Sequence, residues 1–87
     1  MDMTNNLHRR NEDIYGIIAA NIKVCRKQAK ITQAELADRT HYSHEFIRRI
    51  EAPNGKKYFS IDTLVQIARA LDVRVEELLK GINSGDE

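Results

Sequence analysis

The sequence is poor in residues that break helices and in residues that cross-link small secreted proteins. Its 87 residues include one proline, four glycines and one cysteine, and no tryptophan. So few chain breakers favour helices over many tight turns. The single cysteine, Cys25, cannot form an internal disulfide, so we expect a reduced, cytoplasmic setting.

Long apolar runs are also missing. No stretch approaches the roughly 20 apolar residues that span a bilayer, and the N-terminus lacks a signal-peptide apolar block. We therefore expect neither a membrane span nor secretion. The apolar fraction of 41% is ordinary for a globular protein, and the length suits one small domain with a single core.

Charge is nearly balanced over the whole chain but unevenly distributed along it. The formal net charge is +1, whereas the section from Lys23 to Lys57 carries +5 and the section from Asp72 to Glu87 carries −3. A basic centre with an acidic end is typical of a protein that contacts phosphates with one face. Chance produces similar asymmetry on many surfaces, so the pattern is supporting evidence only.

Apolar periodicity predicts a first helix from a cap at Asn11 or Asp13 to about Ala29. Residues 1–12 are polar and aperiodic, and we expect a flexible N-terminal segment there. The expected inward stripe of the helix repeats every three to four residues and is widened by two more side chains. The stripe consists of Ile14, Ile18, Ile22, Cys25 and Ala29, with Ile17 and Val24 beside it.

Two short helices are expected in the middle of the chain. Thr32 and Glu35 form a capping-box pattern for a helix ending near Arg39, and Ser43 caps a second helix ending at Ile50 or Glu51. Only a few residues separate the two helices. Such a pair, with a polar second helix left exposed, forms a helix-turn-helix, a shape that fits the DNA major groove.

The second half of the chain predicts a loop over residues 52–59 and two further helices. Ser60 caps a helix whose apolar stripe is Ile61, Leu64, Val65, Ile67, Ala68 and Leu71. A short helix is expected over Val75 to Lys80, with Gly81 as its C-cap and residues 82–87 as a flexible tail. The fold class is therefore an all-α, compact five-helix bundle in one domain, residues 13–81. The alternative is a small hairpin at Asn54-Gly55, which would need the preceding helix as one arm. Tyr58 and Phe59 are expected to fold back onto the core between the third and fourth helices.

The residues of the two central helices and of the fourth helix together match a known family. They are Gln33, Leu36, Ala37, Ile47, Ile50 and Glu51, followed by residues 60–64 and 68–73. Over roughly residues 14–80 the chain resembles the phage-repressor-like (Cro/XRE) helix-turn-helix family. The resemblance implies a sequence-specific transcriptional regulator, more often a repressor, that binds double-stranded DNA at a palindromic operator as a homodimer. We expect no cofactor, and no small-molecule ligand is evident from the sequence.

The resemblance also assigns candidate roles to single residues. His44, Glu45 and Arg49 match positions that face base edges, where Arg49 suits guanine and Glu45 suits cytosine. An alternative for the last two is an ion pair on a solvated helix face. The candidate phosphate contacts are Thr32, Gln33, Ser43, Arg48, Lys56 and Lys57. Gln33 is otherwise a surface residue in a first helical turn, and the two lysines otherwise only solubilise the loop.

Arg26 and Glu51 match a structural ion pair of the family that holds the end of the reading helix. Two departures accompany the match: His41 stands where the family has a turn glycine, and the loop after Glu51 is about two residues longer than is common. Histidine is among the side chains that tolerate positive φ better.

Other functions find little support in the sequence. His41, His44 and Glu45 are split by the turn, so a metal site is not expected. No nucleophile, base and orienting group stand together, so we do not expect an enzyme. Cys25 is expected to be an inert core residue. The rival hypothesis is an antitoxin-like or other protein-interaction module in which DNA binding is secondary.

Overall fold

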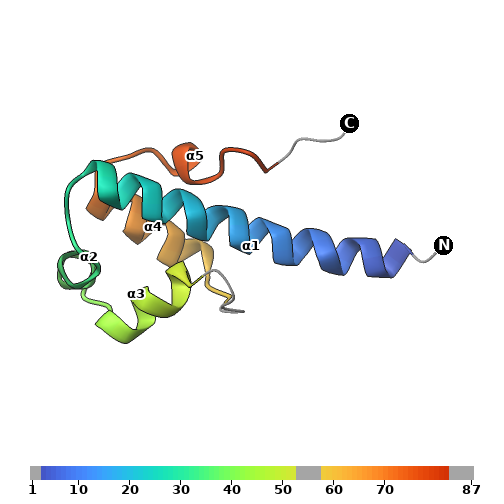
Figure 1. The fold of residues 1–87 in the computed structure, drawn as a ribbon, viewed down its shortest axis with the longest axis horizontal. Coiled ribbons are helices and arrows are strands. Elements are labelled where there is room, and N and C mark those ends of the chain that lie inside the picture. Colours follow the sequence, from blue (N-terminus) through green and yellow to red (C-terminus); the bar gives the residue numbers. More distant parts are fainter. Residues whose placement is uncertain (1–2, 53–57, 83–87) are drawn as a thin grey trace.

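The computed structural model of the chain describes residues 3–52 and 58–82, with side chains from residue 14 onward (Figure 1). The described residues form helices and connecting turns, with no strand among them. The helices are α1 (Met3–Gln28), α2 (Gln33–Thr40), α3 (His44–Glu51), α4 (Ile61–Leu71) and α5 (Val75–Leu78). The all-α prediction is confirmed. The alternative hairpin falls on residues 53–57, outside the described part of the chain.

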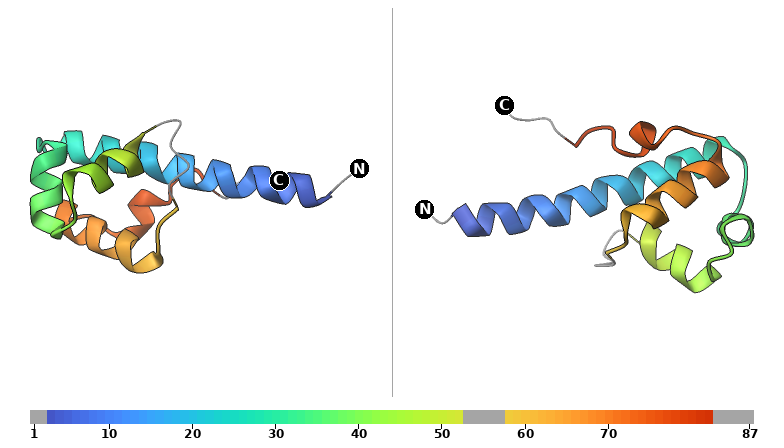
Figure 2. Two further views of the ribbon diagram at one scale, coloured as in Figure 1. Left: turned by 90° about the horizontal axis from the view of Figure 1, so that it is seen from below. Right: turned by 180° about the vertical axis from the view of Figure 1, so that it is seen from behind.

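Helices α2 to α5 gather around the C-terminal half of α1, and the N-terminal half of α1 projects beyond them (Figures 1 and 2). The principal extents of 45 × 23 × 20 Å reflect this projection. Packing contacts join α1 to α3, α4 and α5, and α2 to α3 and α4. The bundle is therefore built on one half of a long helix.

Helix α1 begins at Met3, which corrects the helix start expected at Asn11 or Asp13. No proline or glycine occurs between residues 3 and 13, so nothing in the sequence stops the helix there. Extending an existing helix also avoids the cost of a new nucleus. The flexibility expected for residues 1–12 stays a prediction.

The core receives one fully buried aliphatic side chain from every helix. These side chains are Ile22, Leu36, Ile47, Ile67 and Leu78, all less than 2% exposed. Burying an aliphatic side chain of this size stabilises a fold by roughly 1.5–3 kcal/mol. The five helices therefore depend on one another.

Three residues expected on inward stripes are exposed. Ile61 is 80% exposed and Val24 is 52% exposed, and Ala29 lies beyond the end of α1 on the surface. Val24 follows the buried Ile22 by two residues, which places it about 200° around the helix, on the outer side. Ile61 is the first residue of α4, at the rim of an apolar groove between α1, α4 and α5.

The predicted N-caps are present. Thr32 Oγ1 accepts a hydrogen bond from the Glu35 N–H at 3.0 Å, and Glu35 Oε1 accepts one from the Thr32 N–H at 2.7 Å. Ser43 and Ser60 cap α3 and α4 in the same way, accepting from the N–H groups of Phe46 and Thr63. Each cap is worth about 1 kcal/mol. Local hydrogen bonds thus fix where these three helices begin.

Helix α5 ends at Leu78 and not at Lys80, and its C-cap residue is Leu79 in place of Gly81. The side-chain amide of Asn21 on α1 donates to the carbonyl oxygens of Leu78 and Lys80, each at 2.9 Å. A continuing helix would use the Leu78 carbonyl internally, whereas here Asn21 satisfies it. Gly81 does adopt a left-handed conformation, with φ of 89°, but after the helix has ended.

The rings of Tyr58 and Phe59 both pack on α1, and the expected folding back onto the core is confirmed for Phe59. Their rings lie 4.7 and 5.0 Å from the ring of Tyr15, centroid to centroid. The Tyr15 hydroxyl donates a hydrogen bond to the Phe59 carbonyl at 3.4 Å. Phe59 packs against the core, while Tyr58 remains 56% exposed. The aromatic pair thus ties the chain before α4 to the middle of α1.

Candidate nucleic-acid interface

The connection between α2 and α3 is made by a histidine in a left-handed conformation. His41 has φ of 64° and ψ of 15° and is the C-cap of α2, where its N–H donates to the Asp38 carbonyl. The Thr40 hydroxyl donates to the Leu36 carbonyl at 2.9 Å and accepts from the Tyr42 N–H at 3.3 Å. His41 therefore takes the conformation for which the family uses glycine, and α3 follows at once.

Helix α3 is amphipathic and docks through one face. Ile47 and Ile50 are buried, and Phe46 is half-buried with its ring 5.0 Å from that of Tyr42. The Tyr42 hydroxyl donates to Thr63 Oγ1 at 3.2 Å, which links the turn to α4. The opposite face carries four exposed polar side chains. They are His44, Glu45, Arg48 and Arg49.

The end of α3 is held by a buried ion pair. Arg26 Nε and Nη2 donate to Glu51 Oε2 and Oε1 at 2.7 and 3.0 Å, and the two side chains are only 9% and 2% exposed. Arg26 Nη1 also donates to the Ile31 carbonyl at 2.9 Å. The ion pair expected between α1 and α3 is present. Because it is buried, removing one partner costs more stability than removing one partner of an exposed pair.

Gln33 joins this buried pair. Its Nε2 donates to Glu51 Oε1 at 3.1 Å, and its side chain is half-buried at the start of α2. The sequence contained no signal for this bond, because the two residues are 18 positions apart and belong to different helices. Helices α1, α2 and α3 are therefore joined at a single carboxylate.

The exposed face of α3 contains a carboxylate shared by two arginines. Arg48 Nη2 donates to Glu45 Oε1, and Arg49 Nε donates to Glu45 Oε2 at 3.0 Å. Hydrogen bonds from Arg48 and then Arg49 lower the pKa of the Glu45 carboxyl below its ordinary value. The alternative predicted for Glu45 and Arg49, an intrahelical ion pair, is present, and it also includes Arg48.

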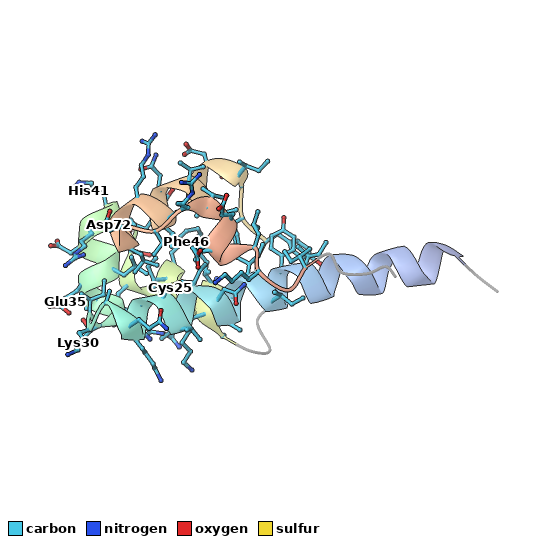
Figure 3. All side chains as sticks on the ribbon, turned by 90° about the horizontal axis from the view of Figure 1, so that it is seen from above. Cys25, Lys30, Glu35, His41, Phe46 and Asp72 are labelled. Atoms are coloured by element: carbon cyan, nitrogen blue, oxygen red, sulfur yellow. The ribbon has the colours of Figure 1, made fainter. Side chains whose placement is uncertain are left out.

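The other predicted contact residues lie in two groups. Thr32 and Ser43 are exposed at the N-termini of α2 and α3, where their hydroxyls serve as caps. Lys56 and Lys57 lie outside the described residues. Figure 3 shows Lys30, Glu35 and His41 at the end of the molecule that α2 forms, with Cys25 and Phe46 nearer its middle.

Cys25 is half-buried against the core, not enclosed within it. Burial, followed by the nearby Glu77, raises the pKa of its thiol above the ordinary value. Such a thiol is a poor nucleophile at neutral pH.

The described part of the chain contains neither a metal-ligand cluster nor a membrane-spanning helix. No group of three or more histidine, cysteine, aspartate or glutamate side chains there is arranged to hold a metal ion. Within the same residues, no helix combines the length and apolar character needed to cross a membrane.

The fold and this exposed helix define a helix-turn-helix protein. The family model described as "Helix-turn-helix" matches residues 22–78, and the chain belongs to that family. The match begins within α1 and ends at the last residue of α5, so it includes the buried Arg26–Glu51 pair and all of α3. The resemblance to phage-repressor-like (Cro/XRE) regulators is confirmed.

One similar curated protein is the "Uncharacterized HTH-type transcriptional regulator YqaE" of Bacillus subtilis (strain 168). It is 35% identical over 65 residues, which are 75% of this chain and 54% of that protein. The chain therefore spans about half the length of this relative. A comparison with solved structures gives no significant match. The family match and the relative agree that the chain contains a helix-turn-helix domain.

Proposed function

We propose that the protein is a sequence-specific, double-stranded DNA-binding transcriptional regulator, acting as a repressor, that inserts α3 into the major groove. The observation that carries the proposal is the exposed polar face of α3 on a helix held at its end by the buried Arg26–Glu51 pair. A major groove about 12 Å wide admits one α-helix, and a rigid helix can present side chains to base edges reproducibly.

The proposed contacts divide into two kinds. His44, Glu45 and Arg49 face base edges, and Arg48 lies toward the DNA backbone. Thr32, Gln33 and Ser43 lie at the N-termini of α2 and α3, where backbone N–H groups favour phosphate oxygens. Because Gln33 also binds Glu51, a phosphate contact by Gln33 would connect the DNA backbone to the pair that orients α3. Lys56 and Lys57 remain phosphate candidates from the sequence alone.

We further propose that two copies bind a palindromic operator with half-sites about one helical turn apart, as is usual for symmetric helix-turn-helix dimers. A groove of about 430 Å³ between α1, α4 and α5 offers apolar surface for a second copy, with Ile61 and Leu79 at 80% and 37% exposure. DNA as the partner would place the protein in the cytoplasm. No enzymatic step is part of the proposal.

Selection of duplexes from a random pool tests the proposal, using the wild type, Arg49→Ala and a control variant, Arg74→Ala. The side chain of Arg74 is 80% exposed, pairs with Glu76 and precedes α5. Arg74→Ala therefore changes the net charge by the same amount as Arg49→Ala but leaves α3 intact. We expect the wild type and Arg74→Ala to enrich the same palindromic sequence. Arg49→Ala should lose preference at one position per half-site, with about 1–3 kcal/mol less discrimination there.

The proposal fails if the wild type enriches no sequence, or if Arg49→Ala selects the same bases with the same affinity. Co-purification of an unrelated protein together with absence of DNA binding would instead support the protein-interaction hypothesis. A reporter gene placed behind the selected duplex separates repression from activation.

A further inference from the structure

Glu45 uses both of its carboxylate oxygens within its own helix. One oxygen accepts from Arg48 and the other from Arg49, so neither is left without a protein donor. Before Glu45 could accept a hydrogen bond from cytosine, at least one of these bonds would have to be shared or broken. The arrangement in the free protein therefore favours a role for Glu45 that acts through the two arginines.

The bond to Glu45 leaves most donors of Arg49 available. A guanidinium has five N–H donors, and Glu45 engages the one on Nε. Over the described residues, the guanidinium of Arg49 makes no other hydrogen bond or ion pair. Its terminal Nη groups can therefore meet a guanine edge while Glu45 holds the Nε side. The Glu45 carboxylate therefore restricts the orientation of the Arg49 guanidinium but leaves its Nη groups free to contact a base.

The same bonds reduce the attraction of α3 for phosphates in general. All three side chains are at least half exposed, at 50%, 60% and 62% for Glu45, Arg48 and Arg49. Exposed intrahelical ion pairs contribute little to stability, so a well-placed DNA partner can replace them. A carboxylate facing DNA also repels phosphates. On DNA of arbitrary sequence, no base contact compensates for breaking the bonds of Glu45 to Arg48 and Arg49. The cluster of these three residues therefore weakens binding to such DNA.

From this geometry we infer that Glu45 is a positioning and selectivity residue, which orients Arg49 for base contact and suppresses binding of Arg48 and Arg49 to DNA of arbitrary sequence. This inference rests on the proposed function. It changes the role expected from the sequence, because Glu45 acts on specificity through the arginines and not by direct contact with cytosine.

The test compares Glu45→Gln with a matched control, Glu76→Gln. Glu76 is also an exposed glutamate paired with an arginine, but it lies on α5 and its loss changes net charge equally. Binding is measured by fluorescence anisotropy against two duplexes, the sequence selected by the wild type and a scrambled sequence of equal composition, over a range of salt concentrations. Circular dichroism verifies that both variants retain the helical fold.

We expect Glu45→Gln to bind the scrambled duplex more tightly. Each added phosphate contact changes the slope of log K against log salt by about −0.9, which corresponds to roughly eightfold tighter binding at 0.1 M salt relative to 1 M. One or two freed arginines should therefore tighten scrambled-duplex binding by about eightfold or more. Affinity for the selected duplex should change less, so the ratio of the two dissociation constants should fall several-fold.

Three outcomes would overturn the inference. If Glu45→Gln matches Glu76→Gln on both duplexes and in salt slope, the cluster has no effect on selectivity. If Glu45→Gln loses only selected-duplex affinity, Glu45 reads a base directly. If the wild type itself shows no preference between the duplexes, the proposed function fails first, which distinguishes that failure from failure of the Glu45 assignment.

Discussion

Removing the carboxylate of Glu51 should destabilise the protein far more than removing any exposed charge. Glu51→Gln keeps the size of the side chain but replaces one acceptor oxygen by an NH2 group facing the donors of Arg26 and Gln33. The guanidinium of Arg26, on a side chain only 9% exposed, then loses its counter-ion. Breaking a buried pair from one side typically costs about 3–5 kcal/mol.

That cost is large against the whole stability of a small domain, which is roughly 5–15 kcal/mol. Near the thermal midpoint, each 1 kcal/mol lowers Tm by roughly 4–8 °C for a domain of 60–100 residues. We therefore expect Glu51→Gln to lower Tm by more than about 12 °C. Urea unfolding followed by circular dichroism gives the free energy directly, because the helices unfold together around one core.

The control is Glu77→Gln. Glu77 binds Lys80 at 2.9 Å, almost the distance within the buried pair, but the two side chains are 40% and 68% exposed. An exposed pair is screened by solvent and contributes little, so Glu77→Gln should barely change the free energy of unfolding. The two ion pairs have similar bond lengths but different burial. Comparing Glu51→Gln with Glu77→Gln therefore separates the effect of desolvation on stability from that of distance.

A double variant completes the test. Arg26→Met with Glu51→Leu removes both buried charges, and replacing a buried pair by apolar side chains is often neutral or stabilising. We expect the double variant to be more stable than either single variant. Two results would contradict the cost expected for a buried unpaired charge. One is a loss below about 1 kcal/mol in Glu51→Gln, and the other is a double-variant loss equal to the sum of the Arg26→Met and Glu51→Leu losses.

Three further predictions follow from the fold. His41→Gly should stabilise the domain by up to about 1 kcal/mol in urea unfolding, because glycine takes the left-handed conformation without steric cost; a loss above that value would contradict it. Ile67→Ala should cost about 2–5 kcal/mol in the same assay, and Ile61→Ala less than 1 kcal/mol, because the former is fully buried and the latter 80% exposed. The Glu45 carboxyl should titrate by NMR below its ordinary value of 4.5, since its arginine bonds favour the charged form. A folded pKa below the unfolded one means that this contribution to stability is present above the unfolded pKa and is lost as pH falls through the folded pKa. If the Glu45 carboxyl has the same pKa in the folded protein as a glutamate in an unstructured peptide, the last prediction is wrong.

Local signals in the sequence predicted the starts of α2, α3 and α4 well. Thr32 and Glu35 stand three residues apart, and Ser43 and Ser60 precede apolar periodic segments, so each cap is determined by neighbouring residues. The turn at His41 was also predictable, since the resemblance indicated where a left-handed residue is required. These features involve interactions within one turn of helix.

Features that depend on distant elements were not predictable in the same way. Periodicity gave the direction of each inward face but not its width, so Val24 and Ile61 were placed inside although neighbouring helices leave them uncovered. The end of α5 depends on Asn21, which is 57 residues from Leu78 in sequence. The start of α1 carried no positive signal, because polar residues without breakers are compatible with both helix and coil.

The site was predicted as a set of residues but not as a set of contacts. The sequence located His44, Glu45, Arg48 and Arg49 on one face, and Arg26 opposite Glu51. It gave no indication that Gln33 binds Glu51 or that Glu45 holds two arginines together. Side-chain geometry decides which alternative is realised when several partners of opposite charge lie within reach.

The most direct test of the central claim is a crystal structure of the protein bound to the duplex that it selects from random DNA. We expect α3 of each of two copies to lie in successive major grooves, with Arg49 at a base edge and the Arg26–Glu51 pair unchanged. A complex in which α3 faces solvent, or in which another surface contacts the DNA, would contradict it.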